Sequence, residues 1–298
     1  MPRFDSYIMV DWSAASVPRT GADSVWIAVL DRDRLGRRRG VRLTNPATRT
    51  AAKTALTGLF KRRLAAGRRV LAGFDFPFGY PEGTARRLGL EGPAWQALWQ
   101  TISLRIDDGP RNENNRFAVA AELNRRLSNG PFPFWGCPAK AEGVYLGQRR
   151  ARTHGPGDLA ERRLADRATA GAQPVWKLFT TGSVGSQILM GLPVLQALRL
   201  HPILRDRIRV WPFETGLTLP PMRGNGGEII LAEIYPSLWL SKAPPGVVKD
   251  AAQVQTVVTT LSALDMEGRI ADVFAPAKPL TPAEEVAVVE EEAWILGV

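Results

Sequence analysis

Cysteine and histidine are almost absent from this 298-residue chain. Cys137 is the single cysteine, so the chain can form neither an intramolecular disulfide nor a cysteine-based zinc or iron–sulfur site. His154 and His201 are the two histidines, which argues against a histidine-rich metal site and leaves little material for a Ser-His-Asp triad. Any catalysis would therefore rely on carboxylates, lysine, arginine, serine or backbone groups.

Long apolar runs are also missing. No stretch approaches the roughly 20 consecutive apolar residues that a membrane-spanning helix needs. Residues 1–10 lack the apolar core behind a basic start that marks a secretory signal. We therefore expect a cytoplasmic location and no membrane partner.

Acidic residues are scarce in the first half of the chain. Residues 1–150 hold 25 basic and 13 acidic residues, a net charge of +12, whereas residues 151–298 hold 14 and 16, a net charge of −2; together these give +10. Only seven of the 39 basic residues are lysine. An arginine-rich half favours a phosphate-bearing partner, either a nucleic acid or a phosphorylated small molecule. A basic surface that binds no nucleic acid is the alternative.

An apolar content of 45% is that of a globular protein. Short apolar runs predict strands at residues 7–12, 24–30, 41–43, 70–74, 207–212 and 228–234, and the first three are close enough to pair as an antiparallel meander. Amphipathic spacing predicts helices within 50–66, 83–105, 113–127, 177–200, 249–264 and 281–292. This order predicts an α/β fold with a mixed sheet.

The domain organisation follows from the same order of elements. We interpret residues 1–298 as a single domain that carries a large, mainly helical insertion at about 83–205. Within it, residues 151–172 are polar and rich in arginine, which predicts a mobile loop or a surface helix. The insertion is the part expected to determine the substrate.

Three acids follow predicted buried strands. Asp11, Asp75 and Glu233 each stand at or near the carboxyl end of a strand, where open α/β sheets bind their ligands. Three ionised acids at one point need a counter-charge, and a divalent ion with oxygen ligands, Mg²⁺ or Mn²⁺, would provide it. We expect these three residues to be the metal ligands and catalytic residues. Separate roles in capping helices or fixing turns are the alternative.

Four short motifs occur in order along the chain: Val10-Asp11-Trp12-Ser13, Gly73-Phe74-Asp75-Phe76-Pro77-Phe78-Gly79, Glu233-Ile234-Tyr235-Pro236 and Lys249-Asp250. Together they resemble the DUF429 proteins, which are grouped with the ribonuclease H-like superfamily as predicted nucleases. The resemblance covers roughly residues 5–82 and 207–270 and leaves the insertion unexplained. It implies a ribonuclease H-like fold, a five-stranded mixed sheet flanked by helices, with strands one to three antiparallel.

The resemblance also implies an activity. In ribonuclease H-like nucleases, acids equivalent to Asp11 and Asp75 hold two Mg²⁺ ions that activate water and stabilise the leaving oxygen of a phosphodiester. Those nucleases usually carry a final acid on the last core helix. Asp250, Asp265 and Asp272 are the candidates here, and none of them stands in a clear motif.

Other polar residues are candidates for helping this chemistry. Lys249, at the start of a predicted helix, would neutralise a phosphate or bridge two acids as a further catalytic residue, with an ordinary surface lysine as the alternative. Arg111, Arg116 and Asn124 belong to a polar run, and the last two share a helical face suited to phosphate binding. A solvated helix face with internal ion pairs is the alternative.

A Gly/Ser-rich segment precedes the helix predicted within 177–200. Lys177 and Ser183, with the rest of the 180–186 segment, resemble a phosphate cradle at a helix amino end. The segment lacks the Gly-Lys-Ser/Thr ending of a P-loop. A turn that simply caps the helix is the alternative.

Three functions fit these patterns. The first is a metal-dependent phosphodiester hydrolase that uses Mg²⁺ or Mn²⁺. The second is an enzyme on a nucleotide or small phosphorylated molecule, of the actin or sugar-kinase type, although residues 11–14 lack the glycine that phosphate loops of that class use. The third is a non-catalytic binding protein on the same fold.

Overall fold

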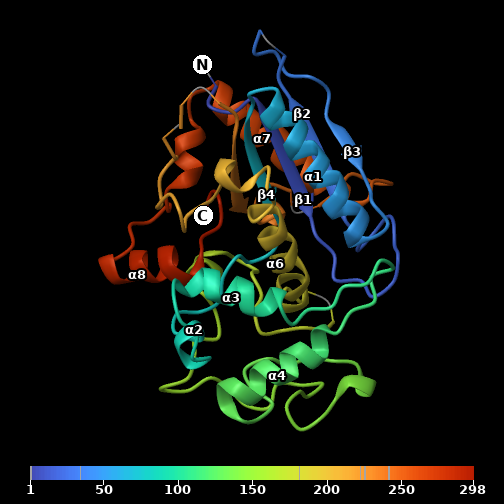
Figure 1. Ribbon diagram of the computed structural model, residues 1–298, viewed down its shortest axis with the longest axis vertical. Coiled ribbons are helices and arrows are strands. Elements are labelled where there is room, and N and C mark those ends of the chain that lie inside the picture. The colour runs from blue at the N-terminus through green and yellow to red at the C-terminus, as the bar shows by residue number, and fades with distance from the viewer. Residues whose placement is uncertain (1, 34, 181, 222, 225, 241) are drawn as a thin grey trace.

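A six-stranded mixed sheet forms the centre of the protein, with the strand order β3-β2-β1-β4-β6-β5 (Figure 1). The computed structural model describes residues 2–33, 35–180, 182–221, 223–224, 226–240 and 242–298. The strands are β1 (Ser6–Asp11), β2 (Trp26–Asp31), β3 (Arg42–Thr44), β4 (Arg69–Phe74), β5 (Ile208–Val210) and β6 (Glu228–Glu233).

The directions of the strands divide the sheet into two parts. β2 is antiparallel to both β1 and β3, whereas β1, β4, β6 and β5 run parallel to one another. The predicted α/β class, the mixed sheet and the antiparallel meander are confirmed. The five strands expected from the family resemblance are one too few, because the short strand β5 adds a sixth at the edge beyond β6.

Apolar residues on alternate positions of the strands form two separate cores, one on each face of the sheet. On one face, Ile8, Val10 and Phe74 pack with α1 (Arg49–Ala65), α3 (Ala94–Ser103) and α6 (Gly185–Arg199). On the other face, Tyr7 and Met9 pack with α7 (Lys249–Met266). The face to which a strand residue points therefore decides which helices it meets.

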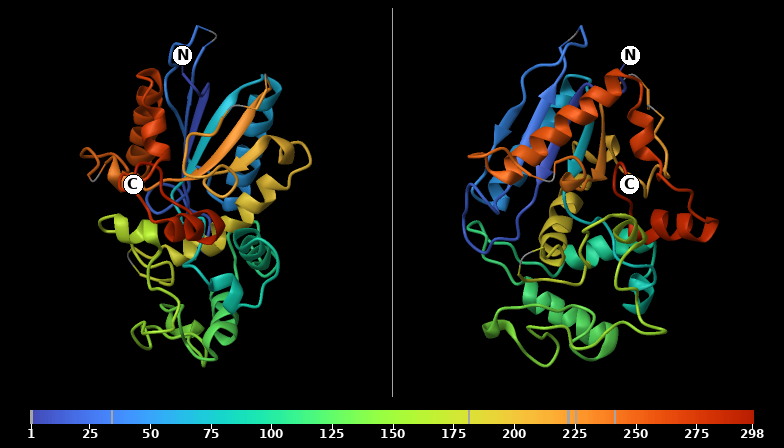
Figure 2. Two further views of the ribbon diagram at one scale, coloured as in Figure 1. Left: turned by 90° about the vertical axis from the view of Figure 1, so that its left-hand side faces the viewer. Right: turned by 180° about the vertical axis from the view of Figure 1, so that it is seen from behind.

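The predicted insertion contributes to the core as well as to the surface. Its helices α3 and α6 pack against the sheet, whereas α4 (Arg116–Ser128) and much of the chain around it form a lobe beyond the end of the sheet (Figures 1 and 2). The remaining helices are α2 (Thr84–Arg87), α5 (Leu164–Ala168) and α8 (Pro282–Ala287), with short helical turns at Ala139–Ala141, Arg205–Arg207, Pro236–Leu238, Ile270–Phe274 and Val288–Glu292.

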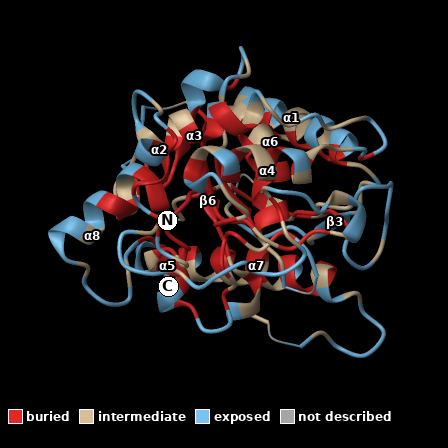
Figure 3. Ribbon diagram, turned by 90° about the horizontal axis from the view of Figure 1, so that it is seen from below, coloured by how far each residue is buried: buried red, intermediate tan, exposed pale blue. Residues whose placement is uncertain are grey.

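Burial follows this layering. The strands are mostly buried, and the outward faces of α1 and α8 are exposed (Figure 3). Within the described residues, no helix is both long enough and apolar enough to span a membrane.

A glycine sets how closely α6 approaches the segment after β4. Gly191 lies in the middle of α6 and faces the ring of Phe76, which is buried. A Cβ at position 191 would lie within 2.6 Å of three atoms of that ring, closer than carbon atoms approach without displacement. Because Gly191 has no side chain, the backbone of α6 packs directly against the aromatic ring.

Candidate functional site

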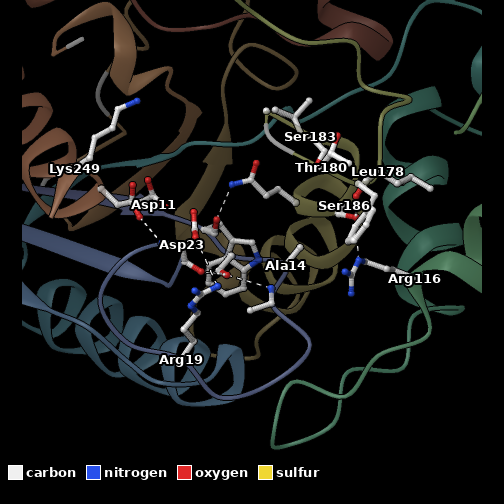
Figure 4. A pocket seen from close by; sticks show the side chains of 18 residues that line it. Asp11, Ala14, Arg19, Asp23, Arg116, Leu178, Thr180, Ser183, Ser186 and Lys249 are labelled. Carbon is white, nitrogen blue, oxygen red and sulfur yellow. Dashed lines mark hydrogen bonds and ion pairs between the residues drawn. The ribbon is translucent and has the colours of Figure 1, made fainter. Parts of the chain in front are cut away.

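A cleft of about 610 Å³ opens beyond the carboxyl end of β1. Four parts of the chain line it: the end of β1 and the segment after it, the first turn of α7, the start of α6 with the segment before it, and the first residue of α4, Arg116. In Figure 4, Asp11, Asp23 and Lys249 lie on one side, while Thr180, Ser183, Ser186 and Arg116 lie on the other. The cleft therefore has an acidic wall, which also carries Lys249 and the Arg19 that pairs with Asp23 at 3.6 Å, and a wall of hydroxyls with one guanidinium.

The acidic wall is set by the register of β1 and β4. Val10 pairs with Phe74, so Asp11 and Asp75 follow directly on neighbouring parallel strands and point to the same face, the face that α7 covers. The carboxylate of Asp75 accepts a hydrogen bond of 2.6 Å from the backbone N–H of Trp12. Asp250, in the first turn of α7, is close enough for its charge to act on both acids.

The three acids hold their protons more tightly than isolated carboxyls do. Burial, followed by the charges of Asp75 and Asp250, raises the pKa of Asp11 well above its usual value. Burial raises the pKa of Asp75 to about 7, although the hydrogen bond from Trp12 opposes this shift. Burial also raises the pKa of Asp250 against the hydrogen bond that it accepts from the backbone of Asp23.

These acids lack an ion-pair partner in the described part of the chain. Among the residues that the structure describes, no arginine or lysine forms an ion pair with Asp11, Asp75 or Asp250. Lys249 is exposed on the cleft wall, and its positive charge lowers the pKa of the adjacent Asp250 only in part. The site therefore concentrates negative charge beside an open cleft, which is the electrostatic requirement for binding a cation.

The prediction that Glu233 shares this site is wrong. Glu233 pairs with Phe74, one position before Asp75, so its side chain points to the opposite face of the sheet. There both oxygens of its carboxylate accept hydrogen bonds from the guanidinium of Arg163, at 2.7 and 2.8 Å, and Phe78 donates its backbone N–H at 2.9 Å. Glu233 is thus a buried structural residue whose charge is already compensated.

Of the three acids considered for the last core helix, Asp250 is the one at the cleft. Asp265 is buried at the other end of α7, where it accepts hydrogen bonds from the hydroxyl of Tyr7 and from backbone N–H groups. Asp272 is exposed and paired with Arg269. The sequence contained no signal that separates these three, because their distances from Asp11 depend on how α7 lies across the sheet.

The opposite wall contains a guanidinium that pairs with no carboxylate of the described residues. Arg116 is buried, and its side chain donates to the hydroxyls of Ser186 and Ser16 at 2.9 Å and to the side-chain oxygen of Asn114 at 2.7 Å. Burial and the nearby charge of Arg49 lower its pKa to about 10, so it stays protonated at neutral pH. A buried cation held only by neutral groups is ready to bind an anion.

The other predicted phosphate-binding residues are distributed unevenly. Ser183 lines the cleft as expected. Asn124 does not, because its amide is used within the lobe, where it bonds to the backbone of Phe134 and to the carbonyl of Tyr145. Arg111 is exposed in the loop before α4 and does not line the cleft.

Lys177 is also outside the lining of the cleft. Its ammonium lies 5.8 Å from the centre of the Trp135 ring, and its carbonyl accepts a hydrogen bond from the backbone of Gly185. Thr181, part of the expected phosphate cradle, lies outside the described residues. Ser186, the last residue of the segment expected to form the cradle, also lines the cleft. Gln187 lines it too and was not predicted, because an amide in the first turn of a helix has no distinctive pattern.

The carboxylates alone do not make a complete metal site. Within the described residues, no three acid, histidine or cysteine side chains are grouped as a ready set of metal ligands. Mg²⁺ is often bound by only one or two carboxylates, with water and substrate phosphate as the other ligands. Asp11 and Asp75, with Asp250 nearby, fit that mode of binding.

Comparisons with known proteins add no relative: no family model, no curated protein and no solved structure matches the chain. The functional argument therefore depends on the geometry and electrostatics of the cleft.

Replacement of Arg116 tests the role of the second wall. We expect Arg116→Gln to raise the Kd for inorganic phosphate about 100-fold, because a charge-assisted bond to an anion contributes roughly 2–3 kcal/mol. The variant should unfold at the same or a higher temperature than the wild type, since a buried charge that pairs with no described carboxylate is removed. Isothermal titration calorimetry and thermal unfolding measure the two effects. A marked fall in stability would instead indicate a structural residue.

Proposed function

We propose that the protein is a metal-dependent phosphodiester hydrolase whose active site is the cleft between β1, α7 and α6. The observation that carries this proposal is the pair of adjacent acids, Asp11 and Asp75, with Asp250 beside them and no compensating cation among the described residues. A second support is Arg116 on the facing wall, which gives a phosphate group a partner across the cleft.

The fold agrees with this proposal. A mixed sheet whose first three strands are antiparallel, with β4 next to β1, is what the resemblance to the DUF429 proteins and the ribonuclease H-like superfamily implies. We infer that the chain is a ribonuclease H-like protein with an added edge strand and a large insertion. The residues assigned by the resemblance to metal binding, Asp11 and Asp75, are those that the register of the strands brings together.

The roles of the protein residues follow from their places in the cleft. Asp11 and Asp75 would hold Mg²⁺ or Mn²⁺, with Asp250 in support, and the ion would supply the positive charge that activates water and stabilises the leaving oxygen. Arg116 binds a non-reacting phosphate oxygen and fixes the position of the phosphodiester. Lys249 is exposed beside the acids and attracts the negatively charged substrate.

Metal binding by Asp250 tests the proposal directly. We expect Asp250→Asn to weaken Mn²⁺ binding, measured by isothermal titration calorimetry, by about 10–100-fold, the range seen when a supporting group of a metal site is lost. Cleavage of labelled single-stranded and duplex oligonucleotides should require Mg²⁺ or Mn²⁺, stop in EDTA, and fall in parallel with metal affinity.

Asp272→Asn is the matched control, because it makes the same chemical change at an exposed acid that is paired with Arg269. It should bind Mn²⁺ and cleave as the wild type does. Equal Mn²⁺ affinity in both variants, together with no cleavage of any oligonucleotide, would refute the proposed function. Stabilisation by micromolar ATP in the same preparations would favour an enzyme on a nucleotide instead.

A further inference from the structure

A second concave site, of about 370 Å³, lies between β3 and the last turns of α1. We call it the arginine site; five arginines, one aspartate and one leucine line it: Arg39, Arg42, Arg62, Arg63, Arg68, Asp31 and Leu59. Asp31 pairs with Ser6 at the beginning of β1, whereas Trp26 pairs with Asp11 at its end. The arginine site is therefore at the opposite end of the sheet from the cleft, about 17 Å away along the strands.

The arginine site has an excess of positive charge. Asp31 is its only acid, and its carboxylate is engaged by Arg42 at 2.8 Å and by Arg63 at 2.7 Å. Five guanidinium groups against one carboxylate leave a net charge of +4 in a small volume. Such crowding of like charges is unfavourable in the free protein and is relieved by an anion.

Many of the N–H groups of these arginine side chains form no hydrogen bond within the described protein. Among the described residues, the side chains of Arg39 and Arg62 have no hydrogen-bond or ion-pair partner, and both are exposed. Arg68 uses its Nη1 on the carbonyls of Asp5 and Arg32. β3, at the edge of the sheet, is exposed along its whole length, so nothing described covers this side of the site.

Helix α1 connects the arginine site to the cleft. It contains five basic residues and no acidic one, and it is about 25 Å long. At its amino end, Arg49 donates to the carbonyls of Ser13 and Ala15, which line the cleft. Lys53 and Lys61 are exposed along the helix, and Arg62 is exposed near its carboxyl end. Arg49 itself is buried and paired with Asp108 at 2.6 Å, so the exposed basic side chains extend from Lys53, one turn after Arg49, to the arginine site.

We propose that the arginine site binds backbone phosphates of a nucleic acid that extends along α1 from the cleft. This inference rests on the proposed function, because it identifies the substrate as a polymer. A span of about 17 Å corresponds to roughly five nucleotides of one strand of a duplex, at 3.4 Å each. A compact anion would use the arginine site alone, whereas the exposed Lys53 and Lys61 place further positive charge along α1 toward the cleft, which favours a polymer.

Binding of a fluorescein-labelled 20-nucleotide oligonucleotide, single-stranded and duplex, tests the proposal by fluorescence anisotropy in EDTA, so that no cleavage occurs. We expect Arg39→Gln/Arg62→Gln to raise Kd at least 10-fold at 100 mM salt. The slope of log Kd against log salt should fall by about 1.4–1.8, because each lost phosphate contact removes roughly 0.7–0.9. Neither arginine has a partner in the described structure, so the fold should be unaffected.

Arg205→Gln/Arg269→Gln is the control, because it removes the same charge from exposed positions outside the arginine site, where the ion pairs are solvent-exposed. It should change Kd less than twofold. Equal shifts in the two double variants, or no binding of either oligonucleotide by the wild type, would overturn the proposal. Loss of inorganic tripolyphosphate binding with unchanged oligonucleotide affinity would also overturn it, in favour of a compact anion.

The two proposals can fail separately. Oligonucleotide binding that depends on Arg39 and Arg62, without cleavage in Mg²⁺ or Mn²⁺, would refute the hydrolase and keep the arginine site. Cleavage by the wild type, with an unchanged salt slope in the double variant, would refute the arginine site and keep the hydrolase.

Discussion

Asp11→Asn should abolish metal-dependent cleavage and at the same time make the protein more stable at pH 8. We expect activity to fall at least about 1000-fold, equivalent to roughly 4 kcal/mol of transition-state stabilisation, because the substitution removes an anionic metal ligand. The free energy of unfolding at pH 8, without added metal, should rise by about 2 kcal/mol, because a neutral amide no longer repels Asp75 and Asp250.

The direction of the pH dependence follows from the raised pKa values. Asp11 and Asp75 have higher pKa values in the folded protein than in the unfolded chain, so the folded state binds more protons as the pH rises above about 4. The contribution of Asp75 to stability is complete below about pH 4 and is lost as the pH rises through about 7, and that of Asp11 is lost in the same direction. The advantage of Asp11→Asn over the wild type should therefore be small at pH 4 and largest at pH 8.

Urea unfolding at several pH values, with and without Mn²⁺, measures this effect. Mn²⁺ at 100 times its Kd should stabilise the wild type by about 2.7 kcal/mol and the variant much less. A variant that is less stable than the wild type at pH 8 would contradict the repulsion among the acids, whatever happens to activity. The same change at the exposed Asp272 is the control, and it should leave the pH dependence unaltered.

Arg163→Met should destabilise the protein by about 3–5 kcal/mol. Arg163 is completely buried and pairs with both Glu233 and Asp166 at 2.7 Å, and it also donates to the carbonyl of Glu292. Its removal leaves two carboxylates without a cation in the interior, and an uncompensated buried charge lowers the free energy of unfolding strongly. Chemical denaturation should show the loss, and the loss should be smaller at pH 5, where buried carboxyls take up protons more easily.

Glu233→Gln distinguishes a structural role from a catalytic one. We expect this variant to keep cleavage activity within a few-fold of the wild type, because its side chain lies on the face of the sheet away from Asp11. Combined with Arg163→Met, it should recover part of the lost stability, since one uncompensated charge is removed. A loss of activity as large as that of Asp11→Asn, in a folded protein, would indicate that Glu233 has a catalytic role.

The sequence was sufficient to predict most of the fold, because apolar periodicity is a local property. The helix predicted at residues 50–66 is α1, and the one predicted at 249–264 is α7. The meeting of Asp11 and Asp75 was also predictable, since both follow buried strands of similar length that run the same way. What separated Glu233 from these two acids was the register of its strand, because Glu233 pairs with Phe74 and not with Asp75.

Whether Glu233 lies with Asp11 and Asp75 could not be predicted from its position near the end of a strand. A displacement of one residue in the pairing of β6 with β4 is invisible in the sequence, yet it moves a side chain to the other face of the sheet. Arg163 shows the same limit. It lies in the polar segment 151–172, which was expected to be mobile or on the surface, but it is fully buried because its partners Glu233 and Asp166 come from distant and near parts of the chain.

The contact between Gly191 and Phe76 fixes the position of α6, and α6 forms part of one wall of the cleft. Ser186 and Gln187 line the cleft five and four residues before Gly191 on the same α6, and Phe76 immediately follows the acid Asp75. A methyl group at position 191 would lie within 2.6 Å of the ring, so the helix and the ring would have to separate. Any movement of α6 would carry Ser186 and Gln187 with it, so the width of the cleft depends on a contact outside its lining.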